Sequence, residues 1–400
     1  MKKSLFLSLS FLALSSAVSA QETKFSGEAG TLWAGAVRPS KRGEFVIGDT
    51  YFNGKFEAFE NKSSILAEGR ADFDEVSGDT YFDLKEIWLD YTDDLWGLRI
   101  GRQKTQWGKA DGIDITNVIC PKDYSSLRAQ FDDESCARDA ARLSFTRDSL
   151  TADAYFIPFF TPSPLPGEKT ALIASQNLPD KNLRSAEYGL KLSGYFSFCD
   201  LSLYGFYGWE DIPFMDYKMD SSSNITVSAG YERLLMFGAD AAVPLGETVL
   251  RLEAAFFPQR HMQSQAQDIL AGGEVTKHRN NLLALAGLDW MPSGWTFTAQ
   301  YFADYLWGST DGLERDKNYT HGATLSISKK LLSDTLELSA SGVLMLDDFD
   351  SAVELSGEYS LTDSIFLELG AYIFNEGKEK GTYGEYKDMT SVYFKARYVF

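Results

Sequence analysis

The sequence predicts an all-β protein whose strands close into one transmembrane antiparallel barrel of about 18 strands, with 16 as the alternative. Three observations predict this fold. Apolar and polar residues alternate with a period of two from residue 23 onward, which is typical of strands with one apolar and one polar face. Short and long connections alternate along the chain. The last strand is rich in aromatic residues and ends at Phe400.

Residues 1–20 have the three parts of a secretory signal peptide. Two lysines precede an apolar run, and the segment ends in the small residues Val18-Ser19-Ala20. The apolar run is shorter than the roughly 20 residues that a membrane-spanning helix needs. We therefore expect cleavage after Ala20 and a single barrel domain over residues 21–400.

The composition excludes some classes of protein. The chain has 57 acidic and 38 basic side chains and a formal net charge of −19. Because nucleic-acid phosphates repel such an excess of carboxylates, we expect no nucleic-acid partner. Aromatic residues make up 14% of the chain, which argues against disorder.

The strands follow in order from the alternating segments and the turn residues between them. The predicted strands are 23–37, 50–60, 64–74, 80–91, 95–103, 139–147, 150–158, 184–198, 200–209, 225–243, 247–257, 278–290, 294–305, 320–330, 334–346, 351–360, 363–374 and 389–400. Every second connection is a tight turn, whereas most of the others are longer, notably 104–138, 159–183, 210–224 and 258–277. Short periplasmic turns and long extracellular loops are typical of a Gram-negative outer-membrane barrel. An even strand number places both termini in the periplasm.

The last strand supports the membrane prediction. Alternation over 392–400 turns one set of side chains to lipid, namely Val392, Phe394, Ala396, Tyr398 and Phe400. Lys395 and Arg397 then face the lumen. A terminal Phe on an alternating aromatic strand resembles the C-terminal signal of Gram-negative outer-membrane proteins.

The same alternation assigns charged side chains to the lumen, because Arg or Lys facing lipid at mid-membrane costs about 2–4 kcal/mol. The pore-lining candidates are Glu86, Asp90, Arg99, Gln103, Arg142, Glu187, Lys191, Asp240, Arg251, Glu253, Asp289 and Asp304. Acidic residues outnumber basic ones among the predicted lumen residues, which favours a wet pore with a negative bias. Alternatively, these charges pair with one another across the wall and are structural.

A barrel of this width is too wide for its own side chains to fill, so a constriction must come from a loop. The candidate is the 104–138 connection. Its charged candidates are Lys109, Asp111, Asp114, Lys122, Asp123 and Arg128. If the loop folds inward, its acids are expected to face Arg99 and Arg142 and create a transverse field. The alternative is a solvated extracellular loop.

Cysteine and histidine are scarce. Cys120 and Cys136 lie in one loop and are a possible disulfide, while three unpaired thiols, with Cys199, are the alternative. The sequence contains no HExxH, GxSxG or CxxC motif. We therefore expect no enzymatic activity, no cofactor and no metal.

Several segments resemble a known family. Gly101-Arg102-Gln103, Trp107-Gly108, Asp111 and Pro121-Lys122-Asp123 resemble the GRQ…WG…D…NP(R/K)D signature of a porin-like outer-membrane family of Gram-negative bacteria. The segments 187–194, 200–204 and 209–213 are similar to its next block. Cys120 departs from the pattern, because the family usually carries Asn there. The resemblance implies a barrel that handles solutes, similar in architecture to alginate-export and substrate-specific porins.

The sequence thus predicts an outer-membrane channel for passive diffusion of small hydrophilic solutes or ions. The alternatives are a substrate-selective transporter or exporter of larger or apolar molecules, and a structural or adhesive barrel with its function in the loops. The expected partners are outer-membrane lipid and lipopolysaccharide, small solutes and the barrel-insertion machinery. A homo-oligomer and a monomer are both left open by the sequence.

Overall fold

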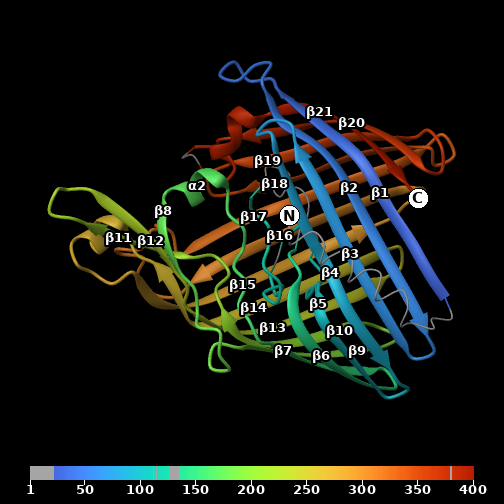
Figure 1. The fold of residues 1–400 in the computed structure, drawn as a ribbon, viewed down its shortest axis with the longest axis horizontal. Helices are drawn as coiled ribbons and strands as arrows, with labels where there is room; N and C mark the ends of the chain where they lie inside the picture. Colours follow the sequence, from blue (N-terminus) through green and yellow to red (C-terminus); the bar gives the residue numbers. More distant parts are fainter. Residues whose placement is uncertain (1–21, 111, 114, 126–134, 379–380) are drawn as a thin grey trace, which may run out of the picture.

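The structure is a computed structural model, and it describes residues 22–110, 112–113, 115–125, 135–378 and 381–400. Within these ranges, 18 antiparallel strands form one closed sheet (Figure 1). The barrel strands are β1 (Glu22–Ala36), β2 (Phe45–Glu60), β3 (Ser63–Asp74), β4 (Asp79–Thr92), β5 (Trp96–Gln103), β6 (Arg138–Arg147), β7 (Leu150–Ile157), β9 (Glu187–Tyr195), β10 (Asp200–Trp209), β13 (Arg233–Leu245), β14 (Thr248–Gln263), β15 (Thr276–Trp290), β16 (Trp295–Leu306), β17 (Tyr319–Leu331), β18 (Leu336–Met345), β19 (Ser351–Ser360), β20 (Ile365–Asn375) and β21 (Ser391–Val399). The predicted 18-stranded barrel is confirmed, and the 16-stranded alternative is wrong.

The first and last strands close the barrel. β1 pairs with β21 in antiparallel register, with Glu28 opposite Val399. Gly27 and Phe400 exchange both backbone hydrogen bonds at 3.0 Å, so the pairing extends to the last residue of the chain. Both ends of the barrel domain therefore lie at the rim that carries the tight turns, which we call the short-turn end. The opposite rim is the long-loop end.

The two faces of the wall differ in exposure, as the period of two requires. In β10, Leu203 is 49% exposed, whereas its neighbour Tyr204 is only 5% exposed. The outer face carries apolar and aromatic side chains over most strands. The inner face carries the charged residues and the packed loop described below.

The connections at the long-loop end contain secondary structure of their own. They hold α2 (Gly167–Ala171), β8 (Ile173–Asn177), β11 (Phe214–Met219), β12 (Ile225–Gly230), α3 (Ala266–Leu270) and the 3-10 helix η2 (Gly384–Met389). β8, β11 and β12 form a small separate sheet, which projects beyond the barrel in Figure 1. None of the helices among the described residues is long and apolar enough to span a bilayer.

One predicted strand joins two separate elements of the structure. The predicted strand 225–243 is two elements, because the chain leaves the small sheet after β12 and enters the barrel at β13. Tyr231 lies at the break, where its hydroxyl accepts a hydrogen bond from Gln176 of β8. The break carries no Pro and follows a Gly that also fits a strand, so the alternation shows no interruption there.

Candidate functional site

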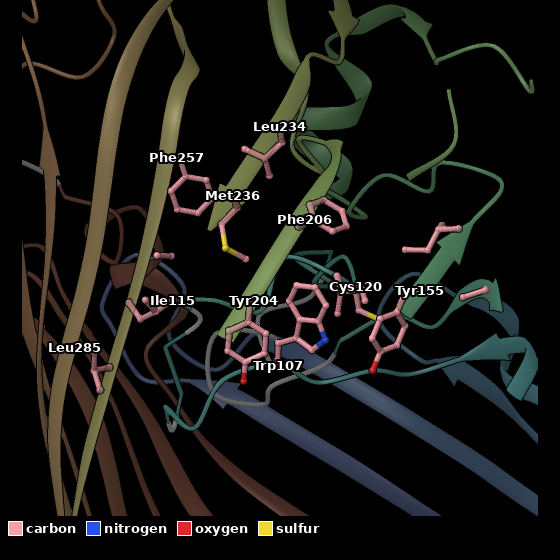
Figure 2. Packing of buried hydrophobic residues seen from close by; sticks show 14 residues of the cluster. Trp107, Ile115, Cys120, Tyr155, Tyr204, Phe206, Leu234, Met236, Phe257 and Leu285 are labelled. Carbon is pink, nitrogen blue, oxygen red and sulfur yellow. The ribbon is translucent and has the colours of Figure 1, made fainter. Parts of the chain in front are cut away.

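The loop between β5 and β6 lies on the inner face of the wall and packs there through Trp107. The Trp107 side chain is 2% exposed and stacks on Tyr204 with 5.0 Å between ring centroids. Tyr155 and Phe206 contact it edge-on, at 5.8 and 6.2 Å (Figure 2). The rest of the cluster comes from Ile115, Ile119, Cys120, Ala140, Ile157, Leu234, Met236, Ala255, Phe257 and Leu285. Burial of this much apolar surface holds the loop against strands β6 to β15.

A single carboxylate on the wall fixes the backbone of the loop. Glu253 on β14 is 5% exposed and accepts hydrogen bonds from the amides of Lys109 and Ala110, both at 2.9 Å. It also accepts from the amide and the hydroxyl of Thr116, both at 2.7 Å. Four donors to one buried carboxylate specify one position for the loop.

Gly108 is required at the point of closest approach between loop and wall. Its φ is +84°, and a Cβ atom there would collide with the Glu253 carboxylate and the Thr116 hydroxyl. The Gly108 amide donates to the Tyr204 hydroxyl at 3.1 Å, and this hydroxyl donates to Asp240. Only glycine tolerates both the left-handed backbone conformation and the close contact with the wall.

Charged residues line the wall on the short-turn side of the loop. The Lys109 ammonium lies 3.7 Å from Asp240 and 3.6 Å from Asp200. Arg251 pairs with Asp289 at 2.5 Å and donates to the Lys109 carbonyl at 2.7 Å. The loop and the wall therefore share one network of alternating charges, which includes four of the sequence-predicted residues.

This charged belt continues around the wall to β4. Asp90 lies 2.7 Å from Arg99 and 3.6 Å from Arg142. The expectation that acids of the loop face these two arginines is not met by the described residues, since a wall carboxylate already occupies that position. Lys191 continues the belt on β9, with its ammonium 5.5 Å from the centroid of the Tyr204 ring.

The remaining candidates at the start of the loop contact its backbone. Glu86 accepts a hydrogen bond from the Lys104 amide at 2.7 Å. Gln103 is 1% exposed and donates to the Ala140 carbonyl at 2.9 Å. Further along, Lys122 pairs as an isolated bridge with Ser135, and Asp123 accepts from the Ser125 amide at 2.8 Å. Asp111, Asp114 and Arg128 lie outside the described residues.

On the long-loop side, a buried ion-pair group joins the wall to the connections. Arg138 lies 2.9 Å from Glu187 and also donates to Asp211. The pKa of Asp211 is raised to about 7, chiefly by burial and also by Glu187 and Glu210, while Arg138 opposes this shift. The sequence prediction included Glu187 but missed Arg138. Alternation with Arg142 would have placed Arg138 on the same inner face.

Two cavities lie on the long-loop side of the loop. The outer one has a volume of about 1100 Å³ and the inner one about 160 Å³. Both are lined by Tyr124, Glu210, Ile212 and Arg260, so they meet at the Arg260–Glu210 ion pair. Asp304 lines the outer cavity and pairs with Arg315 at 2.7 Å. The inner cavity reaches the apolar part of the loop.

The possible disulfide between Cys120 and Cys136 is not formed, because both are free thiols, as is Cys199. The Cys136 amide donates to the Pro121 carbonyl at 2.7 Å, so Cys136 lies opposite Pro121 rather than opposite Cys120. The Cys120 thiol instead accepts a hydrogen bond from the Thr105 amide at 3.3 Å.

The far wall carries further acids. The Tyr393 hydroxyl lies 2.8 Å from Glu354 and 2.5 Å from Glu368, so its one proton is shared between the two carboxylates. Arg397 pairs with Glu358 at 2.8 Å. In the described ranges, no group of three His, Cys, Asp or Glu side chains is arranged to hold a metal ion.

Comparison with solved structures finds the same fold at very low sequence identity. OccK8 (OprE) of Pseudomonas aeruginosa is 10% identical, with 95% of this chain and 98% of that chain covered and a TM-score of 0.57. OccK2 (OpdF) of the same organism, in complex with glucuronate, is 10% identical with coverages of 95% and 98% and a TM-score of 0.55. OprD of this organism is 9% identical, with coverages of 96% and 97% and a TM-score of 0.52.

No curated protein matches the sequence. A family model described as "Protein of unknown function (DUF1302)" matches residues 38–364, which is most of the chain. The chain therefore belongs to the DUF1302 family.

Proposed function

We propose that the protein is an outer-membrane channel for passive diffusion of small hydrophilic solutes or ions. The observation that supports this proposal most directly is the position of the β5–β6 loop. Glu253 and Trp107 fix this loop to the inner wall beside a belt of paired charges. Such a loop narrows a barrel that is otherwise too wide to select solutes. The fold shared with OccK8, OccK2 and OprD supports this reading.

The outer face supports placement in the outer membrane. Trp290, Trp295 and Phe297 stack at the short-turn end, with ring centroids 5.4 and 5.5 Å apart. Tyr305 and Trp307 contact each other toward the long-loop end, at 5.1 Å. Two aromatic bands with apolar residues between them are typical of a barrel in lipid. The termini are then periplasmic, and lipid and lipopolysaccharide surround the wall.

Within this proposal, the 104–138 connection is the constriction and the predicted lumen residues line the pathway. The contacts of Gln103, Trp107 and Gly108 give physical reasons for a shared GRQ…WG signature, since these residues join the loop to the wall. Assembly requires the barrel-insertion machinery, as for other such proteins. Association of copies is compatible with the apolar outer face.

One feature favours the alternative of a substrate-selective transporter. The outer cavity is lined largely by apolar and aromatic side chains rather than by unpaired charges. The free energy cost of dehydration on entering this cavity would be smaller for a solute with an apolar body than for a small inorganic ion.

Planar-bilayer conductance of the refolded mature chain tests the channel. We expect discrete conductance steps and a reversal potential that indicates cation preference in a salt gradient. A folded, heat-modifiable barrel that gives no steps would contradict passive diffusion and favour the selective transporter or a barrel with its function in the loops.

A further inference from the structure

The outer cavity has the size and lining of a site for a small organic molecule. Its volume is about 1100 Å³, and its lining includes Ile173 of β8, Phe214 of β11 and Val227 of β12 at the long-loop end. The apolar and aromatic part of its lining includes Leu172, Ile212, Phe214, Met215, Tyr217 and Met262. These side chains would contact an apolar body on several sides.

The basic side chains that line this cavity already have carboxylates beside them. The pairs are Arg260–Glu210 at 2.6 Å, Arg315–Asp304 at 2.7 Å, Lys169–Glu385 at 3.5 Å and His261–Glu232 at 3.7 Å. Arg260 and Arg315 are held further, by Asn281 and by the Lys317 carbonyl. An anionic ligand would have to compete with these pairs for each of the cations.

One acidic residue of the cavity lining differs from the other three in its ion pairing. Among the described residues, the Glu314 carboxylate has no ion-pair partner. Its backbone amide donates to the Gln263 carbonyl at 2.9 Å, which fixes Glu314 at the end of β14. The nearby lysines are already paired: Lys277 with Asp268, Lys218 with Asp216 and Lys317 with Asp348.

Aromatic rings lie in the same part of the lining. Tyr217 and Glu314 both line the cavity, and burial raises the pKa of Tyr217 above its ordinary value, with a smaller contribution from the Glu314 carboxylate. Phe214 starts the same strand, β11, and its ring centroid lies 6.2 Å from that of His261. Aromatic faces attract ammonium groups, and a nearby carboxylate adds to this attraction.

We propose that this cavity binds small organic cations with an aromatic or aliphatic body, with Glu314 as the counter-charge. The inference rests on the proposed channel, whose outer mouth the cavity forms, and it names the class of solute. The bound cation would then pass the Arg260–Glu210 pair, where the outer and inner cavities meet.

Isothermal titration of the folded full-length mature protein in detergent micelles tests the site, with empty micelles as the blank. Three probes share one body and differ in charge: 2-phenylethylammonium, 2-phenylethanol and 3-phenylpropionate. Methylammonium, which lacks the body, is the fourth probe. We expect 2-phenylethylammonium to bind most tightly and 3-phenylpropionate most weakly.

Glu314→Gln should weaken binding of 2-phenylethylammonium about three- to fivefold, which is the range of one solvent-exposed ion pair, and leave 2-phenylethanol unchanged. Glu274→Gln is the matched control, because Glu274 is also exposed at the long-loop end but does not line the cavity. Circular dichroism and heat-modifiable mobility verify that both variants fold.

Tighter binding of 3-phenylpropionate, absence of binding by all probes, or an unchanged ammonium affinity in Glu314→Gln would each overturn the proposal. Conductance is measured separately, so the two proposals fail independently. A protein that conducts but binds no cation refutes only this site. A protein that binds the cation but never conducts refutes only the diffusion channel.

Discussion

Trp107 and Tyr204 stack face to face, with 5.0 Å between their ring centroids, and this contact joins the inward loop to β10. The Tyr204 hydroxyl also accepts from the Gly108 amide at 3.1 Å, so ring and hydroxyl hold adjacent residues of the loop. Residues of the wall therefore determine the position of the loop as much as the loop residues themselves do.

Trp107→Ala should release the loop while the barrel stays folded. Removal of a buried Trp costs about 3–5 kcal/mol, and this loss falls on the loop because the strands have their own hydrogen bonds. We expect trypsin to cleave the folded variant after Lys109, whose amide and carbonyl are hydrogen-bonded to the wall, faster than it cleaves the wild type. Trp33→Ala is the control, because Trp33 lies on the outer face and is 46% exposed. Equal protection in both variants would contradict this role of Trp107.

Glu253→Gln should raise single-channel conductance and current noise. The amide would present its own donors to the Lys109, Ala110 and Thr116 amides, and each buried donor left unpaired costs about 1–3 kcal/mol. Glu57→Gln on β2 is the matched control, since Glu57 pairs with Lys55 at 3.0 Å, far from the loop. If both variants conduct like the wild type, Glu253 does not fix the constriction.

Asp211→Asn should change the pH dependence of stability. The pKa of Asp211 is raised from 3.8 to about 7, so folding favours its protonated form. The contribution of this group is therefore greatest below pH 3.8 and declines as the pH rises toward 7. Asn resembles the protonated acid, so the urea midpoint of the variant should rise relative to the wild type from pH 4 to pH 8. A constant difference between the two proteins would contradict the raised pKa.

The three thiols should react with maleimide at different rates in the folded protein. Burial raises the pKa of Cys120 and of Cys136 to about 11, so the reactive thiolate is scarce at pH 7 for both. Cys199, in a tight turn at the short-turn end, should be labelled first and Cys120 last, as measured by peptide mass spectrometry. Labelling that increases only after reduction would indicate a disulfide between Cys120 and Cys136.

The barrel could be predicted from the sequence because one face of each strand meets apolar surroundings, which enforces the alternation. The same alternation predicts that Arg251 and Asp289 face the lumen, and these two residues form an ion pair on the wall. The contact between Glu253 and the loop could not be predicted, because Gly108 and Thr116 carry no periodic signal and their positions depend on packing between distant segments. For the same reason, the boundary between β12 and β13 was missed.

The closing pair of strands has a consequence for biogenesis. Because β1 pairs with β21 and Gly27 bonds to Phe400, the N-terminal strand has a free edge until the end of the chain has been secreted. Closure is thus impossible during translocation, and a chain that lacks β21 keeps two unpaired edges that are prone to aggregation. We therefore expect the barrel to close only after the final residue of the chain has arrived.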